Sequence, residues 1–195
     1  MEVRILLIVF ITSYFIHAEN QSNAKSPWHA SIQYIGISYH PGGGDNKDKY
    51  PLKIDDDAYW LINVGASLSI DYDIIDSIAF IRSSVAFYKD CGFLYAGYVH
   101  LGMRGVIINI GRHSINGGIG ATLLFRENWK NILGIENDSF YENGILNNRW
   151  EYQFIFYGGE FDYIYQFSQK FAFHYSIIPG FPFVITSKVG IRYDF

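Results

Sequence analysis

The stretch that decides the fold runs from Ala58 to Asp73 and reads AYWLINVGASLSIDYD. Every second residue from Trp60 to Tyr72 is apolar, whereas the alternate positions carry mostly small or polar side chains. The apolar set is Trp60, Ile62, Val64, Ala66, Leu68, Ile70 and Tyr72; the other set is Tyr59, Leu61, Asn63, Gly65, Ser67, Ser69 and Asp71. Because successive side chains of a β-strand point to opposite faces, the stretch predicts one long strand with an apolar face and a mostly polar face.

The same two-residue period recurs along the chain, and helical periodicity is scarce. It covers seven further stretches, which are 28–40, 78–89, 93–110, 115–127, 150–166, 171–178 and 188–195. Within 150–166 the alternation slips near Gly158 and Gly159, which predicts a β-bulge at those residues. The sequence therefore predicts eight strands, with 93–110 as one long strand and ten strands as the alternative.

The lengths of the connecting segments favour eight strands. With 93–110 as one strand, the two long segments 41–57 and 128–149 fall at the same end of the sheet, together with 89–92 and 179–182. The short segments 73–76, 111–114 and 167–170 then fall at the other end. Dividing 93–110 would move the long segment 128–149 to the end with the short turns, so we prefer the undivided strand.

Alternation of apolar and polar residues does not by itself show what the apolar faces contact, since the strands of soluble β-sandwiches alternate as well. Trp, Tyr and Phe gather near the strand ends on the apolar faces, as interfacial aromatic girdles require. Charged residues inside the strands fall on the opposite face, and every strand except 171–178 reaches the roughly 9–11 residues needed to cross a bilayer without help from its turns. Only helices and closed barrels satisfy every backbone group in lipid. We therefore predict an all-β, antiparallel up-and-down transmembrane β-barrel over residues 19–195.

The first residues have the composition of an export signal. Arg4 is followed by an apolar run over residues 5–16 and by the small residue Ala18. An apolar run of this length is too short for a transmembrane helix, which needs about 20 residues. We expect residues 1–18 to be a signal peptide that directs the rest of the chain out of the cytoplasm.

The overall composition indicates no cofactor and no nucleic-acid partner. The formal net charge is −4 and charged residues make up 17% of the chain, without a basic patch. Cys91 is the single cysteine, so no internal disulfide forms, and the sequence has no Cys/His cluster that would predict a structural metal. Five Asp residues in 41–57 could bind Ca²⁺, but their spacing differs from an EF-hand loop and favours a solvated loop tip.

The final strand carries a family resemblance. In VGIRYDF, one face presents Val189, Ile191, Tyr193 and Phe195. This strand resembles the C-terminal strand of bacterial outer-membrane β-barrel proteins, which the barrel-assembly machinery reads as an assembly signal. The resemblance implies a location in the bacterial outer membrane, with outer-membrane lipid and the assembly machinery as partners. We also expect this strand to close the barrel by pairing with residues 28–40.

The face opposite the apolar one predicts what fills the barrel. An eight-stranded barrel has an interior just wide enough for side chains to fill it. The charges expected inside are Arg82, Arg104, Arg126, Lys188 and Arg192 against Asp71, Glu151, Glu160, Asp162 and Asp194. Because buried charges must be paired, we expect a packed lumen of ion pairs and hydrogen bonds, with a narrow solute or proton path as the alternative.

One pair of residues is a candidate catalytic pair. His174 and Ser176 lie two apart in FHYSI, so their side chains share the inward face of one strand. The pair resembles the His-x-Ser element of outer-membrane lipid A deacylases, which are also eight-stranded barrels. In that family the pair faces lipid, is followed by Asn and has a downstream acidic partner, whereas here Ile177 follows and no acidic residue lies between Ser176 and Asp194.

These patterns lead to two candidate functions. The first is a small outer-membrane barrel with a structural or surface-interaction role, in which the loops 41–57 and 128–149 contact a partner. The second is a hydrolase of lipid A or phospholipid that uses His174 and Ser176. We favour the first, because the chain departs from the hydrolase pattern at the positions given above.

Overall fold

A computed structural model describes residues 26–41, 47–76, 78–134, 142–145, 149–180 and 184–195, so the predicted signal peptide lies outside the described residues. Eight long strands correspond to the predicted ones: β1 (Trp28–Tyr39), β2 (Trp60–Ile75), β3 (Ala79–Lys89), β4 (Tyr95–Ile110), β5 (His113–Glu127), β7 (Trp150–Gln166), β8 (Phe171–Gly180) and β9 (Val184–Asp194). The undivided β4 confirms eight strands over ten. Three short elements lie in the long loops: η2 (Lys47–Lys49), α2 (Trp129–Leu133) and β6 (Glu142–Ile145).

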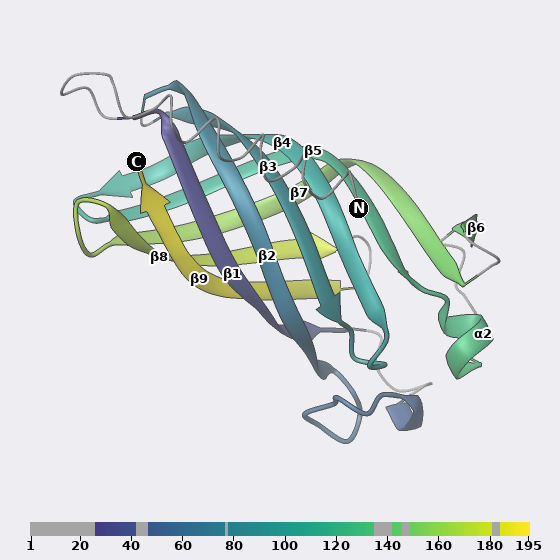
Figure 1. Ribbon diagram of the computed structural model, residues 1–195. Coiled ribbons are helices and arrows are strands. Elements are labelled where there is room, and N and C mark those ends of the chain that lie inside the picture. The colour runs from purple at the N-terminus through teal and green to yellow at the C-terminus, as the bar shows by residue number, and fades with distance from the viewer. Residues whose placement is uncertain (1–25, 42–46, 77, 135–141, 146–148, 181–183) are drawn as a thin grey trace, which may run out of the picture.

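The eight long strands close into an antiparallel barrel. Each strand pairs with its sequence neighbour, β5 pairs directly with β7, and β1 pairs with β9. The predicted closure is confirmed by the register, in which Ile32 lies opposite Ile191 and Tyr34 lies opposite Val189 (Figure 1). The short β6 pairs with the first residues of β7, opposite Glu151 and Tyr152.

The outer face of the barrel is apolar around its circumference. A row of paired residues on neighbouring strands is between 40% and 57% exposed: Ile191, Ile32, Leu68, Val85, Val99, Leu123 and Phe154. Nothing in the barrel covers these side chains, and a soluble protein rarely exposes so large an apolar surface. The outer face is therefore the surface that meets lipid.

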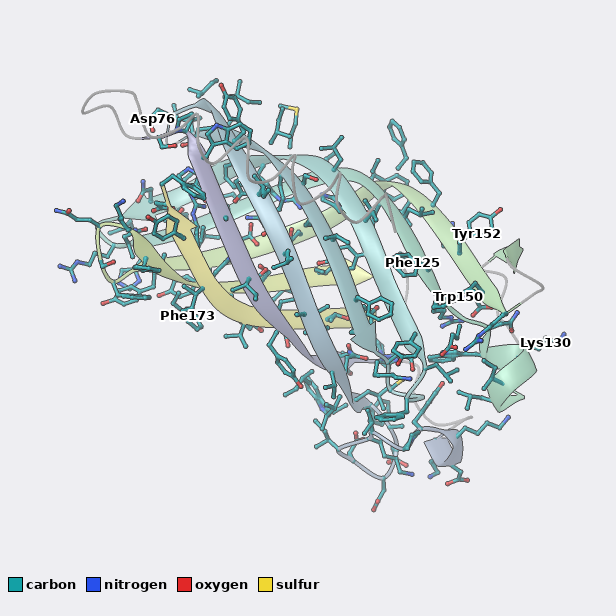
Figure 2. All side chains as sticks on the ribbon, in the orientation of Figure 1. Asp76, Phe125, Lys130, Trp150, Tyr152 and Phe173 are labelled. Carbon is teal, nitrogen blue, oxygen red and sulfur yellow. The ribbon has the colours of Figure 1, made fainter. Side chains whose placement is uncertain are left out.

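Aromatic residues border this apolar band at both ends of the strands. Trp28 packs on Tyr72 with ring centroids 4.7 Å apart, and Tyr39 packs on Trp60 at 4.8 Å. Figure 2 shows Phe125, Trp150 and Tyr152 toward the end with Lys130, and Phe173 toward the end with Asp76. Two aromatic girdles flanking an apolar band are typical of transmembrane β-barrels.

The predicted β-bulge exists, but it lies just before the predicted glycines. Gly158 pairs with Gly120 and Ile155 pairs with Thr122, so β7 has one extra residue between Ile155 and Gly158. As a result the adjacent Phe156 and Tyr157 are 77% and 61% exposed. Gly158 has a different role, because a Cβ there would lie 2.3 Å from Thr122 Oγ1.

The glycines of 117–122 are required by close packing. Gly118 leaves room for a bulky neighbour, since a Cβ there would lie 2.7 Å from Arg104 Cδ. The tighter contact is with the backbone of β4, at 2.0 Å from Met103 O. Gly120 is similarly confined, at 2.2 Å from Leu101 O. The backbones of β4 and β5 therefore lie too close together to leave room for side chains at these positions.

The loops are distributed as predicted, with the long ones at one end and the tight turns at the other. Figure 1 shows η2 and α2 at the end of the barrel opposite the labelled C-terminus. In transmembrane barrels short turns face the periplasm and long loops face the cell exterior, so the end with η2 and α2 is the extracellular end. Of the helices in the described ranges, none has the length and hydropathy to cross a membrane.

Candidate functional site

Glu160 is the centre of a charged network that fills the middle of the lumen. Its Oε1 accepts a hydrogen bond from Lys188 Nζ at 2.5 Å, and its Oε2 accepts from Arg104 Nη2 at 2.7 Å and Arg82 Nη1 at 3.0 Å. The carboxylate is 4% exposed and the three cations are at most 2% exposed. One buried carboxylate therefore neutralises part of the positive charge of three buried cations, which come from three other strands.

Arg82 extends this network across the barrel. It donates to both oxygens of Asp71, at 2.7 and 2.9 Å, and to Asp162 at 2.7 Å. Arg192 lies nearer the turn end and pairs with Asp194 at 2.8 Å and Asp71 at 3.6 Å. The structure thus brings together all the lumen charges predicted from sequence except Arg126 and its partner Glu151.

Arg126 and Glu151 form a separate ion pair at the extracellular end. The Arg126 guanidinium also lies over the ring of Trp129, 4.1 Å from its centroid. The charges expected in the lumen thus include two groups, one around Glu160 and Arg82 and one that contains Arg126 and Glu151. Arg126 is near the end of β5, where its side chain reaches α2 instead of the centre of the barrel.

An apolar layer lies above the charged network. Ile35, Ala86 and Tyr98 are buried together inside the barrel, and Tyr88, Leu124 and Ile178 pack against them. The Tyr98 hydroxyl accepts from Lys188 Nζ at 3.0 Å, so the two layers are in direct contact. Apolar side chains above and ion pairs below fill the lumen, which supports the packed interior over a solute path.

His174 and Ser176 lie within this packed interior, and both are 0% exposed. Ser176 Oγ lies 3.2 Å from His174 Nε2, and it donates to Asp162 Oδ1 at 2.7 Å. The same Asp162 oxygen is 3.1 Å from His174 Nε2. The acidic partner that the sequence did not reveal is thus supplied by β7.

The geometry of this group differs from that of a Ser-His-Asp triad. In a triad the carboxylate bonds the imidazole nitrogen opposite the one that faces Ser. Here Ser176 and Asp162 share Nε2, and the other nitrogen, Nδ1, lies 3.1 Å from Ser31 Oγ. Ser176 also accepts from Gln33 Nε2 at 2.8 Å. The arrangement is a buried hydrogen-bond cluster that joins β1, β7 and β8.

The extracellular end carries a second packed cluster, which we name the cap. It consists of Ala58, Leu61, Cys91 and Trp129, with Tyr50, Leu94 and Leu133 against them. These residues come from the start of β2 and from three loops that are far apart in sequence. Additional bonds tie the loops together, from Leu52 N to Cys91 O at 3.3 Å and from Lys49 Nζ to Gly134 O at 2.7 Å.

Asp90 organises the cap. Its Oδ2 accepts from Trp129 Nε1 at 2.7 Å, while its Oδ1 accepts from the backbone N–H groups of Gly92 and Leu94, each at 2.9 Å. Burial raises the pKa of Asp90, and these hydrogen bonds act in the opposite direction. Sequence reasoning singled out neither Asp90 nor Trp129, since their contact joins loops that only the closed barrel brings together.

The acidic loop 41–57 contributes to the cap through Asp55. Its carboxylate accepts from the backbone N–H groups of Trp60 at 2.7 Å and Tyr59 at 3.1 Å. These bonds lower the pKa of Asp55 and order the turn that leads into β2. Asp45, another member of the acidic group, lies outside the described residues.

The accessibility of the Cys91 thiol tests whether the cap is packed. Burial, followed by the nearby Asp90 carboxylate, raises the pKa of the Cys91 thiol, and the residue is 2% exposed. We expect maleimide to leave Cys91 unmodified in the folded protein and to modify it in the Trp129→Ala variant, as measured by mass spectrometry. Ile132→Ala, an exposed position on the same helix, is the control and should protect Cys91 as the wild type does. Rapid modification of the folded wild type would show that the cap is not packed.

The four residues of the predicted assembly signal lie on the outer face at the closing seam. Val189 and Ile191 are 40% and 41% exposed. Tyr193 packs against Phe171 and Phe195, with ring centroids 5.1 and 5.0 Å apart. The first three of these residues belong to β9, and Phe195 directly follows it.

Comparison with known proteins identifies the fold. No protein-family model and no curated protein matches the sequence. Among solved structures, Ail, the attachment invasion locus protein of Yersinia pestis, matches with a TM-score of 0.52 at 14% identity, over 88% of this chain and 100% of Ail.

Two other small barrels match with lower scores. The N-terminal β-barrel domain of OprF from Pseudomonas aeruginosa has a TM-score of 0.48 at 13% identity, over 88% of this chain and 100% of that chain. Neisserial surface protein A has a TM-score of 0.47 at 10% identity, over 89% and 100%. The closed barrel, its apolar outer face and its fold likeness to Ail show that the chain has the fold of the small eight-stranded β-barrels of bacterial outer membranes.

Proposed function

We propose that this protein is a surface-interaction barrel whose cap contacts a partner outside the cell. The observation that carries the proposal is the ordered cap above a filled lumen. The packed middle of the lumen leaves no path for a solute through the barrel, whereas packing between three loops fixes a surface on the exterior side. Binding residues are commonly found on loops that a rigid scaffold positions.

The outside of the cap presents apolar side chains to solvent. Ile54, Phe93 and Ile132 are 54%, 56% and 46% exposed. Phe93 also has a φ of 61°, in the left-handed region that a bulky residue rarely adopts. Backbone strain of this kind is often retained at functional sites. The fold neighbour Ail is named an attachment invasion locus protein, and an attachment role for this chain accords with such a surface.

The test compares attachment of bacteria that express the wild type with bacteria that express a variant of the cap surface. The variant replaces Ile54, Phe93 and Ile132 by Ser and leaves the buried cap residues unchanged. Attachment is measured on cultured animal cells and on bacteria of the same strain. The control is Ile78→Ser, an exposed apolar residue at the turn end of the barrel.

Two results distinguish surface interaction from a structural role. Loss of attachment in the triple variant alone would support the proposal. If deletion of the protein makes the envelope sensitive to detergent while the triple variant attaches as well as the wild type, the role is structural and the proposal is wrong.

The hydrolase alternative leads to a separate prediction. Because His174 and Ser176 are buried in a hydrogen-bond cluster, we expect His174→Ala and Ser176→Ala to leave the lipid A and phospholipid species unchanged. Mass spectrometry of lipid extracts from the wild-type, variant and deletion strains checks this. A deacylated species present only with the wild-type protein would establish the hydrolase instead.

The barrel-assembly machinery is the second partner that we propose. The apolar face of the last strand, with Tyr193 and Phe195 near its end, is the part of the chain that would be read. The support for this proposal is the sequence resemblance together with the exposed position of Val189 and Ile191 at the seam.

A further inference from the structure

The turn end of the barrel contains a blind polar cavity, which we name the vestibule. Its volume is about 280 Å³, and its lining includes Asp73, Phe80, Asn116, Arg192 and Asp194. The exposed Arg112 lies at its rim, in the turn between β4 and β5. The charged network and the apolar layer fill the barrel beyond the vestibule, so access is from the periplasmic side.

The carboxylates of the vestibule are mostly occupied. Asp194 accepts from three donors, which are His29 Nδ1 at 2.7 Å, Arg192 Nε at 2.8 Å and Gln166 Nε2 at 2.9 Å. Asp73 bonds the other His29 nitrogen at 3.1 Å through one oxygen. Of these carboxylate oxygens, the second oxygen of Asp73 is therefore the one that remains free to accept a hydrogen bond.

The hydrogen-bond donors of the vestibule, in contrast, are not all paired. Asn116 is 2% exposed, and its Oδ1 accepts from Ser114 Oγ at 2.7 Å, which leaves the Nδ2 amide as the free group. Within the part of the chain that the structure describes, Nδ2 has no partner. Nδ2 is not one of the fully buried atoms without a partner, so it is accessible from the vestibule and can donate to a ligand there.

One cation of the vestibule also remains available to an acceptor with negative charge. His29 lies between Asp73 and Asp194, with both ring nitrogens within hydrogen-bond distance of a carboxylate. Arg192 is compensated by Asp194 and Asp71. The Arg112 side chain has no carboxylate partner among the described residues and is the remaining cation at the rim.

From these observations we propose that the vestibule binds a carboxylate, held by the Asn116 amide and the Arg112 guanidinium. Arginine binds carboxylates through two parallel N–H···O bonds, and such charge-assisted bonds are stronger than neutral ones. The free oxygen of Asp73 accepts an N–H group next to that carboxylate. The ligand is a small acylated amino acid or the C-terminal end of a peptide, since both carry a carboxylate beside an amide N–H.

The experiment uses the full mature chain, labelled with ¹⁵N and refolded in detergent micelles. Three probes are titrated: N-acetylglycine, trialanine and trialanine amide, in which the carboxylate is blocked. Binding is followed through the amide resonances of residues 106–116, which border the vestibule. The variants are Arg112→Ala, Asn116→Ala and, as a matched control, Lys170→Ala, which removes a cation of the turn end outside the vestibule.

We expect N-acetylglycine or trialanine to shift the vestibule resonances and trialanine amide to leave them unchanged. Arg112→Ala and Asn116→Ala should each weaken binding about tenfold or more, because each removes at least one hydrogen bond to the charged carboxylate. Lys170→Ala should bind as the wild type does. Binding of trialanine without N-acetylglycine would identify a peptide end as the ligand, and binding of both would include small free acids.

Three results would overturn the proposal. They are the absence of vestibule shifts with both carboxylate probes, equal shifts with trialanine amide, and unchanged affinity in Arg112→Ala. The Arg112 position is decisive even if Asn116→Ala fails to fold, because Arg112 is exposed in a turn and contributes no packing.

Discussion

Replacing Glu160 by Gln is expected to lower the free energy of unfolding by about 3–5 kcal/mol, the usual cost of removing one partner from a buried ion pair. The amide has the shape of the carboxylate but no charge, so Arg82, Arg104 and Lys188 lose their shared counter-charge while they remain buried. Urea unfolding of the protein in lipid vesicles, followed by tryptophan fluorescence, gives the difference.

A surface ion pair is the matched control for this substitution. Asp57 lies 3.2 Å from Lys47, and its side chain is 63% exposed. Exposed pairs contribute about 0–1 kcal/mol, so Asp57→Asn should leave the unfolding curve nearly unchanged. Adding Lys188→Met to Glu160→Gln should recover part of the loss, because it removes one of the uncompensated cations. If Glu160→Gln costs no more than Asp57→Asn, the network does not stabilise the barrel.

Replacing Leu68 by Arg is expected to cost about 2–4 kcal/mol in a bilayer, the cost measured for a cation on the lipid face of a barrel near mid-depth. Leu68 is 55% exposed and lies in the apolar row between Ile32 and Val85. The large effect comes from placing the guanidinium in hydrocarbon, since the leucine makes few contacts inside the protein. The measurement is again unfolding from vesicles.

Ile54→Arg is the control for the lipid-facing substitution. Ile54 is 54% exposed, almost the same fraction as Leu68, but it lies in the extracellular loop. The same type of substitution at equal exposure should therefore cost close to nothing there. Equal costs at the two positions would mean that the outer face of β2 does not meet lipid.

The sequence predicted the strands well because their signal is local. The alternation from Trp60 to Tyr72 is visible in one stretch, and each strand end is marked by its own turn. The bulge in β7 was predicted two residues late, because Gly158 and Gly159 were taken as its cause. Gly158 is in fact required by the contact with Thr122, which belongs to another strand and is invisible in the local pattern.

The partners within the lumen depend on strand register, which the alternation pattern leaves open. Glu160 meets Arg82 across 78 positions of sequence, and Trp129 meets Asp90 across 39. The acidic partner of His174 was sought downstream, yet Asp162 lies 12 residues upstream on the neighbouring strand. Side chains on the inward face could be identified from sequence, whereas their pairs required the closed barrel.

The most direct test of the central claim, closure of an eight-stranded barrel in the membrane, is a disulfide crosslink between β1 and β9. Ile32 and Ile191 are paired residues on the outer face. Paired residues of antiparallel strands have Cα atoms about 4.5–5.5 Å apart, within the range for a disulfide. We predict that Ile32→Cys with Ile191→Cys becomes oxidised in native membranes, detected by altered gel mobility. Ile32→Cys with Ile185→Cys, which is far out of register, should stay reduced. A reduced Ile32–Ile191 pair, or equal crosslinking of both pairs, would contradict the closed barrel.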